Sequence, residues 1–306
     1  MGRAECLGTV ADGNLVSALT PRSYLSPRAD TPPPLDGNLE SGAWAKAPWT
    51  SDFVDISTTV TPRFRTRAKM LWDDTGFYIA AEMEEPHVWA TLTERDSVIF
   101  HDNDFEVFLD PDGDGHRYVE LEMNALNTVW DLLLVRPYRA GGPPVDGFDL
   151  KGLRTHVTVR GTLNDFKDKD QGWTAEIMIP WAALQQVAGV ACPPKEGDQW
   201  RINFSRVQWQ VDEAGKKRPN VPEDNWVWSP QEVIDMHRPE RWGVVQFGGE
   251  LRPYPGAEEY QVLAKAWETP EALPPGVRRF TVNDYFELHL GEFRIDRDLR
   301  TWRAKG

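Results

Sequence analysis

The chain has few cysteines, a deficit of basic residues and no long apolar run. Only Cys6 and Cys192 occur among its 306 residues, so neither a disulfide framework nor a cysteine-based zinc cluster is available. No apolar stretch approaches the roughly 20 residues that a membrane span needs. With 34 Lys+Arg against 48 Asp+Glu, the net charge is −14. This balance argues against nucleic acid as a partner, because nucleic acid selects for basic surfaces.

Common catalytic and cofactor motifs are also missing. The sequence contains no G-x-S-x-G, H-E-x-x-H, G-x-G-x-x-G or Walker loop, and its six histidines are scattered without metal-ligand spacing. Covalent haem is excluded because C-x-x-C-H is absent. We therefore expect a protein without catalytic activity. The first twenty residues carry no clear signal peptide, which leaves the compartment open.

Aromatic residues are abundant by contrast. The chain has 14 Trp, 13 Phe and 7 Tyr in an otherwise polar sequence. So much aromatic surface predicts a bulky core, exposed stacking platforms, or both. Five tryptophans fall inside predicted strands or at motif anchors, where we expect them in the core: Trp44, Trp72, Trp173, Trp181 and Trp242. Trp228 belongs to the segment NWVWSP, at a strand end, and is a candidate platform.

Short apolar-rich runs separated by turn residues indicate an all-β protein. Residues 66–72 and 77–83 flank the turn DDTG and predict a hairpin. Further strands are predicted at 104–110, 116–124, 128–135, 154–160, 173–179, 199–209 and 242–247. Eight or nine short strands with almost no helix predict an antiparallel β-sandwich of two sheets, similar to a jelly roll.

The predicted organisation has three parts. Residues 1–34 are polar and end in three prolines, which predicts a stiff extended segment. Residues 35–248 form the sandwich. Residues 249–306 are a C-terminal appendage, with an amphipathic helix at 258–268 and a hairpin made from 284–290 and 292–296.

Six segments in consistent order carry a family resemblance. They are LDGNLESGAW (35–44), KMLWDDTGFYIAAEMEEP (69–86), HDNDFEVFLDPDGDGHRYVELEMN (101–124), GWTAEIMIPWAAL (172–184), WRINFSRV (200–207) and WVWSPQEVIDMHRPERWGVVQF (226–247). Together they resemble the family 9 carbohydrate-binding modules and family-9-like domains, within the DOMON-like β-sandwich superfamily. The resemblance implies non-covalent carbohydrate binding in an aromatic-lined slot, calcium as structural support, and an extracellular or periplasmic location.

The resemblance also implies positions for the slot. One aromatic wall lies six residues before the glutamate of the signature strand, and counting back from Glu106 places Phe100 in that role. The facing aromatic comes from the loop before the last sandwich strand, where this chain has Met236 and His237. Of the two aromatic walls that the resemblance implies, this chain therefore has one at the expected position, Phe100.

Sugar chemistry adds polar candidates. A hydroxyl buried without a partner costs roughly 1–3 kcal/mol, so charged and amide side chains must line the slot. The strand face next to Phe100 and the strand 199–209 supply such groups. The alternative for Asn203 and Arg206 is a buried role that ties strands together. Our candidate polar contacts are Glu106, Asp102, Asn203, Arg206 and Arg95.

The turn after residue 109 is a candidate calcium site. Asp110, Asp112 and Asp114 match the first half of an EF-hand loop. However, Leu121 stands at the twelfth position and strands flank the loop, so a helix–loop–helix site is excluded. A Ca²⁺ site between strands is our hypothesis, because three carboxylates suit a hard cation. The alternative is a solvated Asp/Gly turn.

Two other functions remain as alternatives to carbohydrate binding. The adjacent Met236 and His237 could ligate haem in an electron carrier, as in some members of the same superfamily. The many carboxylates could also supply the pair, about 5–10 Å apart, that a polysaccharide-active hydrolase uses. We expect a carbohydrate partner and neither nucleic acid binding nor a membrane span.

Overall fold

The computed structural model describes residues 21–58, 60–253, 293–295 and 302–304. The chain divides into two units, and residues 21–254 form the larger one. In the smaller unit, β14 (Phe293–Ile295) pairs antiparallel with β15 (Trp302–Ala304). The predicted helix 258–268 and the strand 284–290 lie outside the described residues.

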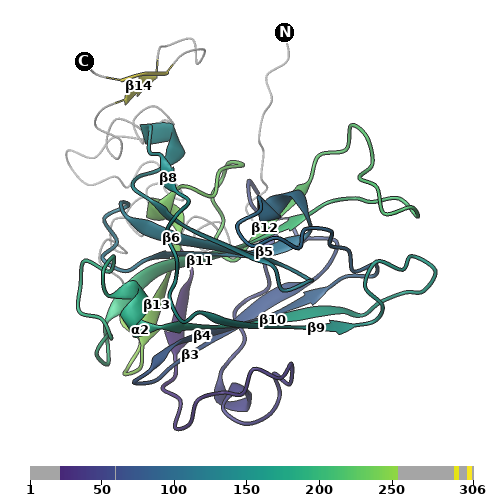
Figure 1. Ribbon diagram of the computed structural model, residues 1–306. Helices are drawn as coiled ribbons and strands as arrows, with labels where there is room; N and C mark the ends of the chain where they lie inside the picture. Colours follow the sequence, from purple (N-terminus) through teal and green to yellow (C-terminus); the bar gives the residue numbers. More distant parts are fainter. Residues whose placement is uncertain (1–20, 59, 254–292, 296–301, 305–306) are drawn as a thin grey trace, which may run out of the picture. The chain divides into compact units, whose positions relative to one another are not determined.

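The larger unit is a sandwich of two sheets, which confirms the predicted fold class (Figure 1). The smaller sheet has the order β3 (Thr66–Trp72), β4 (Gly76–Glu84), β10 (Gly172–Pro180) and β9 (Arg154–Arg160). The main path of the larger sheet runs through β1 (Ser23–Ser26), β13 (Gly243–Phe247), β11 (Gln199–Gln208), β5 (Asp104–Asp110), β6 (Tyr118–Asn124), β7 (Val129–Leu134) and β8 (Pro144–Val145). A side branch pairs β11 with β12 (Asp224–Val227) and β12 with β2 (Val54–Asp55).

The turn between β3 and β4 shows how local chemistry produces the predicted hairpin. Asp73 accepts hydrogen bonds from the backbone N–H groups of Thr75 (2.7 Å) and Gly76 (3.1 Å). It also accepts a hydrogen bond from the Tyr78 hydroxyl at 2.9 Å. An aspartate that bonds the backbone two residues on fixes a tight turn, and the two strands then pair along their whole length.

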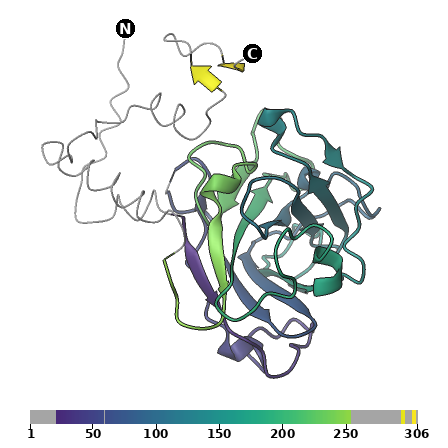
Figure 2. The ribbon, with the colours of Figure 1, turned by 90° about the vertical axis from the view of Figure 1, so that its left-hand side faces the viewer.

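The strand alternation divides the larger sheet into an inner and an outer face. Phe105, Val107 and Leu109 of β5 lie in the main core together with residues of the smaller sheet such as Ile79 and Ile177. Because side chains alternate along a strand, the intervening residues of β5 and β6 are on the outer face. Figure 2 shows the two layers from the side.

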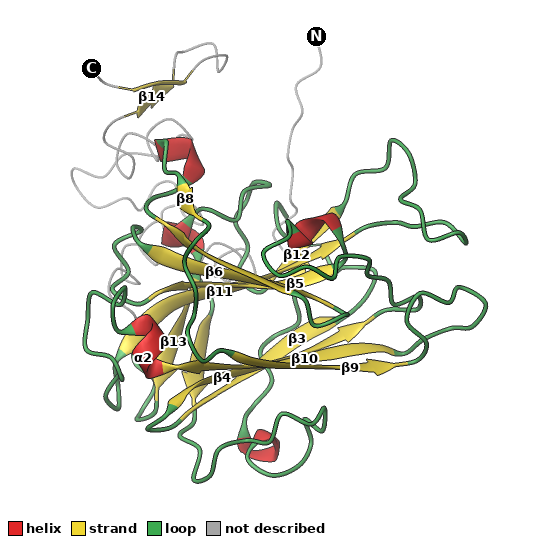
Figure 3. Ribbon diagram, in the orientation of Figure 1, coloured by secondary structure: helices red, strands yellow, loops and turns green. Residues whose placement is uncertain are grey.

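Short helices and loops cover parts of both outer faces (Figure 3). The helical turns are η1 (Trp44–Lys46), η2 (Ile99–His101), η3 (Tyr138–Ala140), α2 (Trp181–Leu184) and η4 (Pro239–Arg241). None of the helices in the described part of the chain is long and apolar enough to cross a membrane.

The N-terminal segment contributes to the sheet. β1 lies within the segment predicted as a separate extended stretch, and it pairs with β13 in parallel. Its Tyr24 is buried, with its hydroxyl donating to the carbonyl of Pro48 at 2.6 Å. The larger sheet therefore starts before Leu35 and contains one parallel pair in an otherwise antiparallel arrangement.

Candidate functional site

A row of side chains crosses four strands on the outer face of the larger sheet. Ser205 of β11 lies opposite Glu106 of β5, Glu106 lies opposite Glu122 of β6, and Glu122 lies opposite Trp130 of β7. Residues directly opposite each other in a sheet project to the same face. The pairing of four strands thus brings together residues that are up to 99 positions apart in sequence.

Four carboxylates gather at this row. Asp104, Glu106, Glu120 and Glu122 are all buried, and within residues 21–58 and 60–253 none of them forms an ion pair with Lys or Arg. Burial raises the pKa of Glu106 to about 7. Burial and then the charge of Glu106 raise the pKa of the other three carboxyls. We call these four residues the carboxylate cluster.

Exposed aromatic rings flank the carboxylate cluster. Phe100 is 39% exposed, and its backbone N–H donates to Glu122 Oε2 at 2.9 Å. Tyr138 is 44% exposed, and burial together with the charges of Glu120, Asp146 and Glu122 raises its pKa to about 12. Glu122 therefore lies next to the backbone of Phe100 and near enough to Tyr138 for its charge to act on the hydroxyl. Half-buried Trp130 adds a third ring within the row.

The loop predicted to supply the second wall packs beneath Tyr138. Met236 is buried in a cluster on the outer face, and its carbonyl accepts a hydrogen bond from Trp242 Nε1 at 2.8 Å. The ring of His237 lies edge-on to Tyr138, with 4.5 Å between centroids. The more exposed ring here thus belongs to Tyr138, which the sequence does not single out because it sits in a Pro/Gly-rich loop outside the resembling segments.

His237 gives this loop a predicted pH dependence. Its Nδ1 pairs with the Tyr118 hydroxyl at 2.9 Å, and burial lowers the pKa of His237 to about 4. Since the unfolded chain binds the proton near pH 6.5, the stability from neutral His237 is complete above that pH and is lost as pH falls towards 4. We expect this histidine to remove about 2 kcal/mol of stability between pH 7.5 and pH 5.

Urea unfolding of the wild type and of His237→Gln at both pH values measures that contribution. The variant should lose less stability on acidification than the wild type, because glutamine does not titrate. An equal loss in the two proteins would show that His237 is protonated as easily in the folded chain as in the unfolded one.

Two predicted polar contacts hold the protein together. Asp102 accepts hydrogen bonds from the backbone N–H groups of Thr91 and Leu92 at 2.7 and 2.8 Å. Asn203 donates to the carbonyl of Ser229 at 2.8 Å and accepts from its N–H at 2.8 Å. Both side chains are fully buried. These hydrogen bonds hold the loop after β4 and the segment after β12 in place, so Asn203 has the structural role that the sequence also allows.

Three further residues predicted to contact the sugar instead contact other parts of the protein. Arg206 is 0% exposed and reaches between the sheets. Arg95 pairs with Asp131 and, at 3.1 Å, with Asp149. Trp228 is buried against Phe204 rather than exposed as a platform. Of the predicted ligand-binding residues, Phe100, Glu106 and Asp102 lie at the carboxylate cluster, and the 236–237 loop packs against Tyr138.

The acidic turn is folded as the sequence predicts. Oxygens of Asp110, Asp112 and Asp114 lie within 4.8 Å of one another. The buried Asp110 carboxylate accepts backbone N–H groups from Gly113 at 3.1 Å and Gly115 at 2.9 Å. Burial raises the pKa of Asp110 to about 7. The donor set fits a hard cation, and calcium at this turn stays a prediction.

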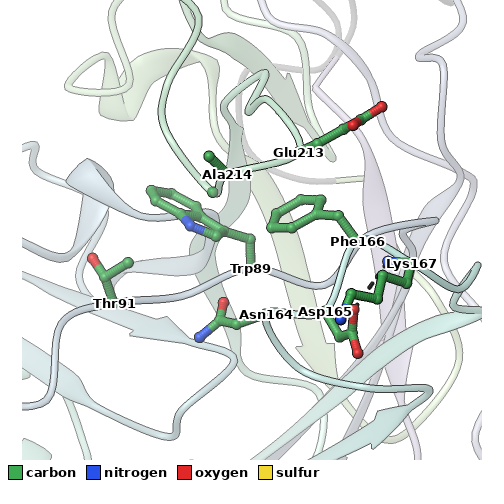
Figure 4. A pocket seen from close by; sticks show the side chains of 9 residues that line it. Trp89, Thr91, Asn164, Asp165, Phe166, Lys167, Glu213 and Ala214 are labelled. Atoms are coloured by element: carbon green, nitrogen blue, oxygen red, sulfur yellow. Dashed lines mark hydrogen bonds between the residues drawn. The ribbon is translucent and has the colours of Figure 1, made fainter.

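A separate groove of about 680 Å³ has its own aromatic lining. Figure 4 shows the rings of Trp89 and Phe166 beside each other, while Glu213 points away. The other lining residues are Thr91, Asn164, Asp165, Lys167, Ala214 and Gly215. Such a groove could also accept a sugar face, so any binding experiment must separate it from the carboxylate cluster.

Comparison with known proteins agrees with this architecture. The family model described as carbohydrate family 9 binding domain-like matches residues 35–248. A family 9 carbohydrate-binding module from Caldicellulosiruptor kristjanssonii, solved in complex with cellotriose, is 15% identical with a TM-score of 0.50, over 76% of this chain and 98% of that chain. A putative carbohydrate-binding protein from Bacteroides uniformis is 16% identical with a TM-score of 0.55, over 74% and 100%. No curated protein matches the chain significantly.

Proposed function

Since the chain belongs to the carbohydrate family 9 binding domain-like family over residues 35–248, we propose that it binds carbohydrate without catalysing a reaction. The sugar would bind on the outer face of the larger sheet. The observation that carries this location is the pair of exposed rings, Phe100 and Tyr138, next to the carboxylate cluster. Aromatic rings cover the apolar face of a sugar, and carboxylates accept hydrogen bonds from its hydroxyls.

The first test is a binding screen. A glycan array followed by calorimetry should identify a ligand, and cello-oligosaccharides are the first probes because a family 9 module was solved with cellotriose. Phe100→Ala should weaken binding at least about tenfold, or about 1.4 kcal/mol. Its melting temperature should stay close to that of the wild type, because the bonds of Phe100 to Glu122 and Trp209 use backbone atoms that alanine retains.

Phe166→Ala is the matched control. Phe166 lines the other groove, so this variant should bind as the wild type does. Loss of binding in Phe166→Ala but not in Phe100→Ala would place the sugar in the groove of Figure 4. Release of shortened sugars during incubation would support a hydrolase, and a haem band in the visible spectrum would support the electron carrier.

We also propose Ca²⁺ as a structural ion at the acidic turn. The support is the grouping of Asp110, Asp112 and Asp114 and the backbone bonds that orient Asp110. Asp112→Asn removes one charged ligand there. Its effect on Ca²⁺ binding is measured in the experiment that follows, where it also serves as a control.

A further inference from the structure

The carboxylate cluster has the dimensions of a cation site. Asp104, Glu106 and Glu122 each offer an oxygen, and these oxygens lie within 4.8 Å of one another. Oxygen ligands of Ca²⁺ lie 2.3–2.6 Å from the ion, so two of them can be at most roughly 5 Å apart. One ion can therefore reach all three carboxylates. They come from neighbouring strands, so the backbone pairing of β5 and β6 fixes their spacing.

The cluster carries negative charge that the described protein groups balance only in part. Its members are buried, and the groups that influence the carboxyl of Asp104 include the acidic Glu106, Asp102 and Glu120. The nearby Arg206 acts on Asp104 through its charge, but it faces the other side of the sheet and pairs with Glu85 at 3.5 Å. A buried carboxylate without a counter-charge is strongly unfavourable. Protons or a bound cation must supply the missing charge.

Two buried oxygens at the cluster lack a well-formed hydrogen bond. Asp104 Oδ2 and Ser205 Oγ have no partner of normal geometry, although buried polar atoms are nearly always paired, and both side chains lie close enough to the Glu106 carboxyl to lower its pKa. Ser205 lies directly opposite Glu106 in the row. The other carboxylate oxygen of Asp104, Oδ1, accepts a hydrogen bond from the N–H of Val207 at 3.0 Å. The two atoms without a well-formed hydrogen bond are thus oxygens, the ligand type that hard cations prefer, and they lie at the carboxylate cluster.

We propose that Asp104, Glu106 and Glu122 bind one hard divalent cation, with Ser205 next to it. This site is distinct from the acidic turn, which begins with the last residue of β5, Asp110. It does not depend on the sugar, so its test needs no carbohydrate and its outcome is separate from that of the binding screen.

The test is calorimetric titration of chelator-treated protein with Ca²⁺, using the full chain. Glu122→Gln removes one charge while its amide oxygen can still accept the N–H of Phe100. We expect the number of bound Ca²⁺ ions to fall by one in this variant relative to the wild type. Asp112→Asn should retain the cluster site. Circular dichroism confirms that each variant is folded before titration.

Thermal unfolding gives a second readout. Without Ca²⁺, Glu122→Gln should melt at a higher temperature than the wild type, because it relieves repulsion among buried carboxylates. With millimolar Ca²⁺, Asp112→Asn should gain melting temperature through the cluster, and the double variant Glu122→Gln/Asp112→Asn should gain none.

Two results would overturn the proposal. One is Ca²⁺ binding that Asp112→Asn abolishes and Glu122→Gln leaves intact, which would assign the ion to the acidic turn alone. The other is no Ca²⁺ or Mn²⁺ binding by the wild type at neutral pH, which would mean that protons neutralise the cluster.

Discussion

Arg206→Met is expected to lower the free energy of unfolding by about 3–5 kcal/mol. The guanidinium of Arg206 donates to Thr66 Oγ1 and to the carbonyl of Glu84, both at 2.9 Å, and to Gln208 Oε1. It also lies 3.5 Å from the buried carboxylate of Glu85. Methionine would leave that carboxylate without its cation, and an unpaired buried charge is what makes such a substitution costly.

Arg65→Met is the matched control. Arg65 directly precedes β3 and pairs with Glu82 and Glu84 at 3.4 Å, but its side chain is 42% exposed. Exposed pairs contribute at most about 1 kcal/mol, so urea unfolding should separate the two variants clearly. If Arg206→Met loses little stability but binds sugar more weakly, Arg206 contacts the ligand, as the sequence predicts.

The fold could be predicted from the sequence because its signals are local. The turn at Asp73 and the alternation along 66–72 and 77–83 identify a hairpin without knowledge of the rest of the chain. β1 could not be found in this way. Its four residues form a strand because they pair with β13, which lies more than 200 positions later in the sequence.

The site was predicted less completely, because polarity in a sequence does not reveal a side chain's partner. Asp102 and Asn203 look like ligand contacts, yet their hydrogen bonds go to protein groups, among them the backbone of Thr91, Leu92 and Ser229. Their roles depend on loops that meet only in the folded chain.

The meeting of the carboxylates and aromatic rings also depends on long-range pairing. The register of β5, β6 and β7 sets Glu106, Glu122 and Trp130 in one row. A shift of one residue would move each strand's side chains to the other face. The sequence pattern shows which residues share a face within each strand, but it does not fix which residues of different strands lie opposite each other.

Tyr138→Ala is expected to weaken sugar binding about as much as Phe100→Ala, by roughly tenfold or more. The Tyr138 ring is exposed near Glu120 and Glu122 and stacks edge-on against His237, which supports it from the protein side. Tyr138→Phe keeps the ring and should retain most of the affinity if stacking is the dominant contribution. Because the side chain is 44% exposed, neither change should alter stability by more than about 0.5 kcal/mol.

Met236→Ala tests whether the second wall of the slot is Tyr138 or the residue at the position that the family resemblance implies. Met236 is 8% exposed in an apolar cluster, so its truncation should cost about 2–5 kcal/mol of stability. At a temperature where the variant is folded, its affinity should stay near that of the wild type. Calorimetry with the sugar identified in the screen measures both affinities. Full affinity in Tyr138→Ala, with binding lost in folded Met236→Ala, would move the second wall of the slot to residue 236.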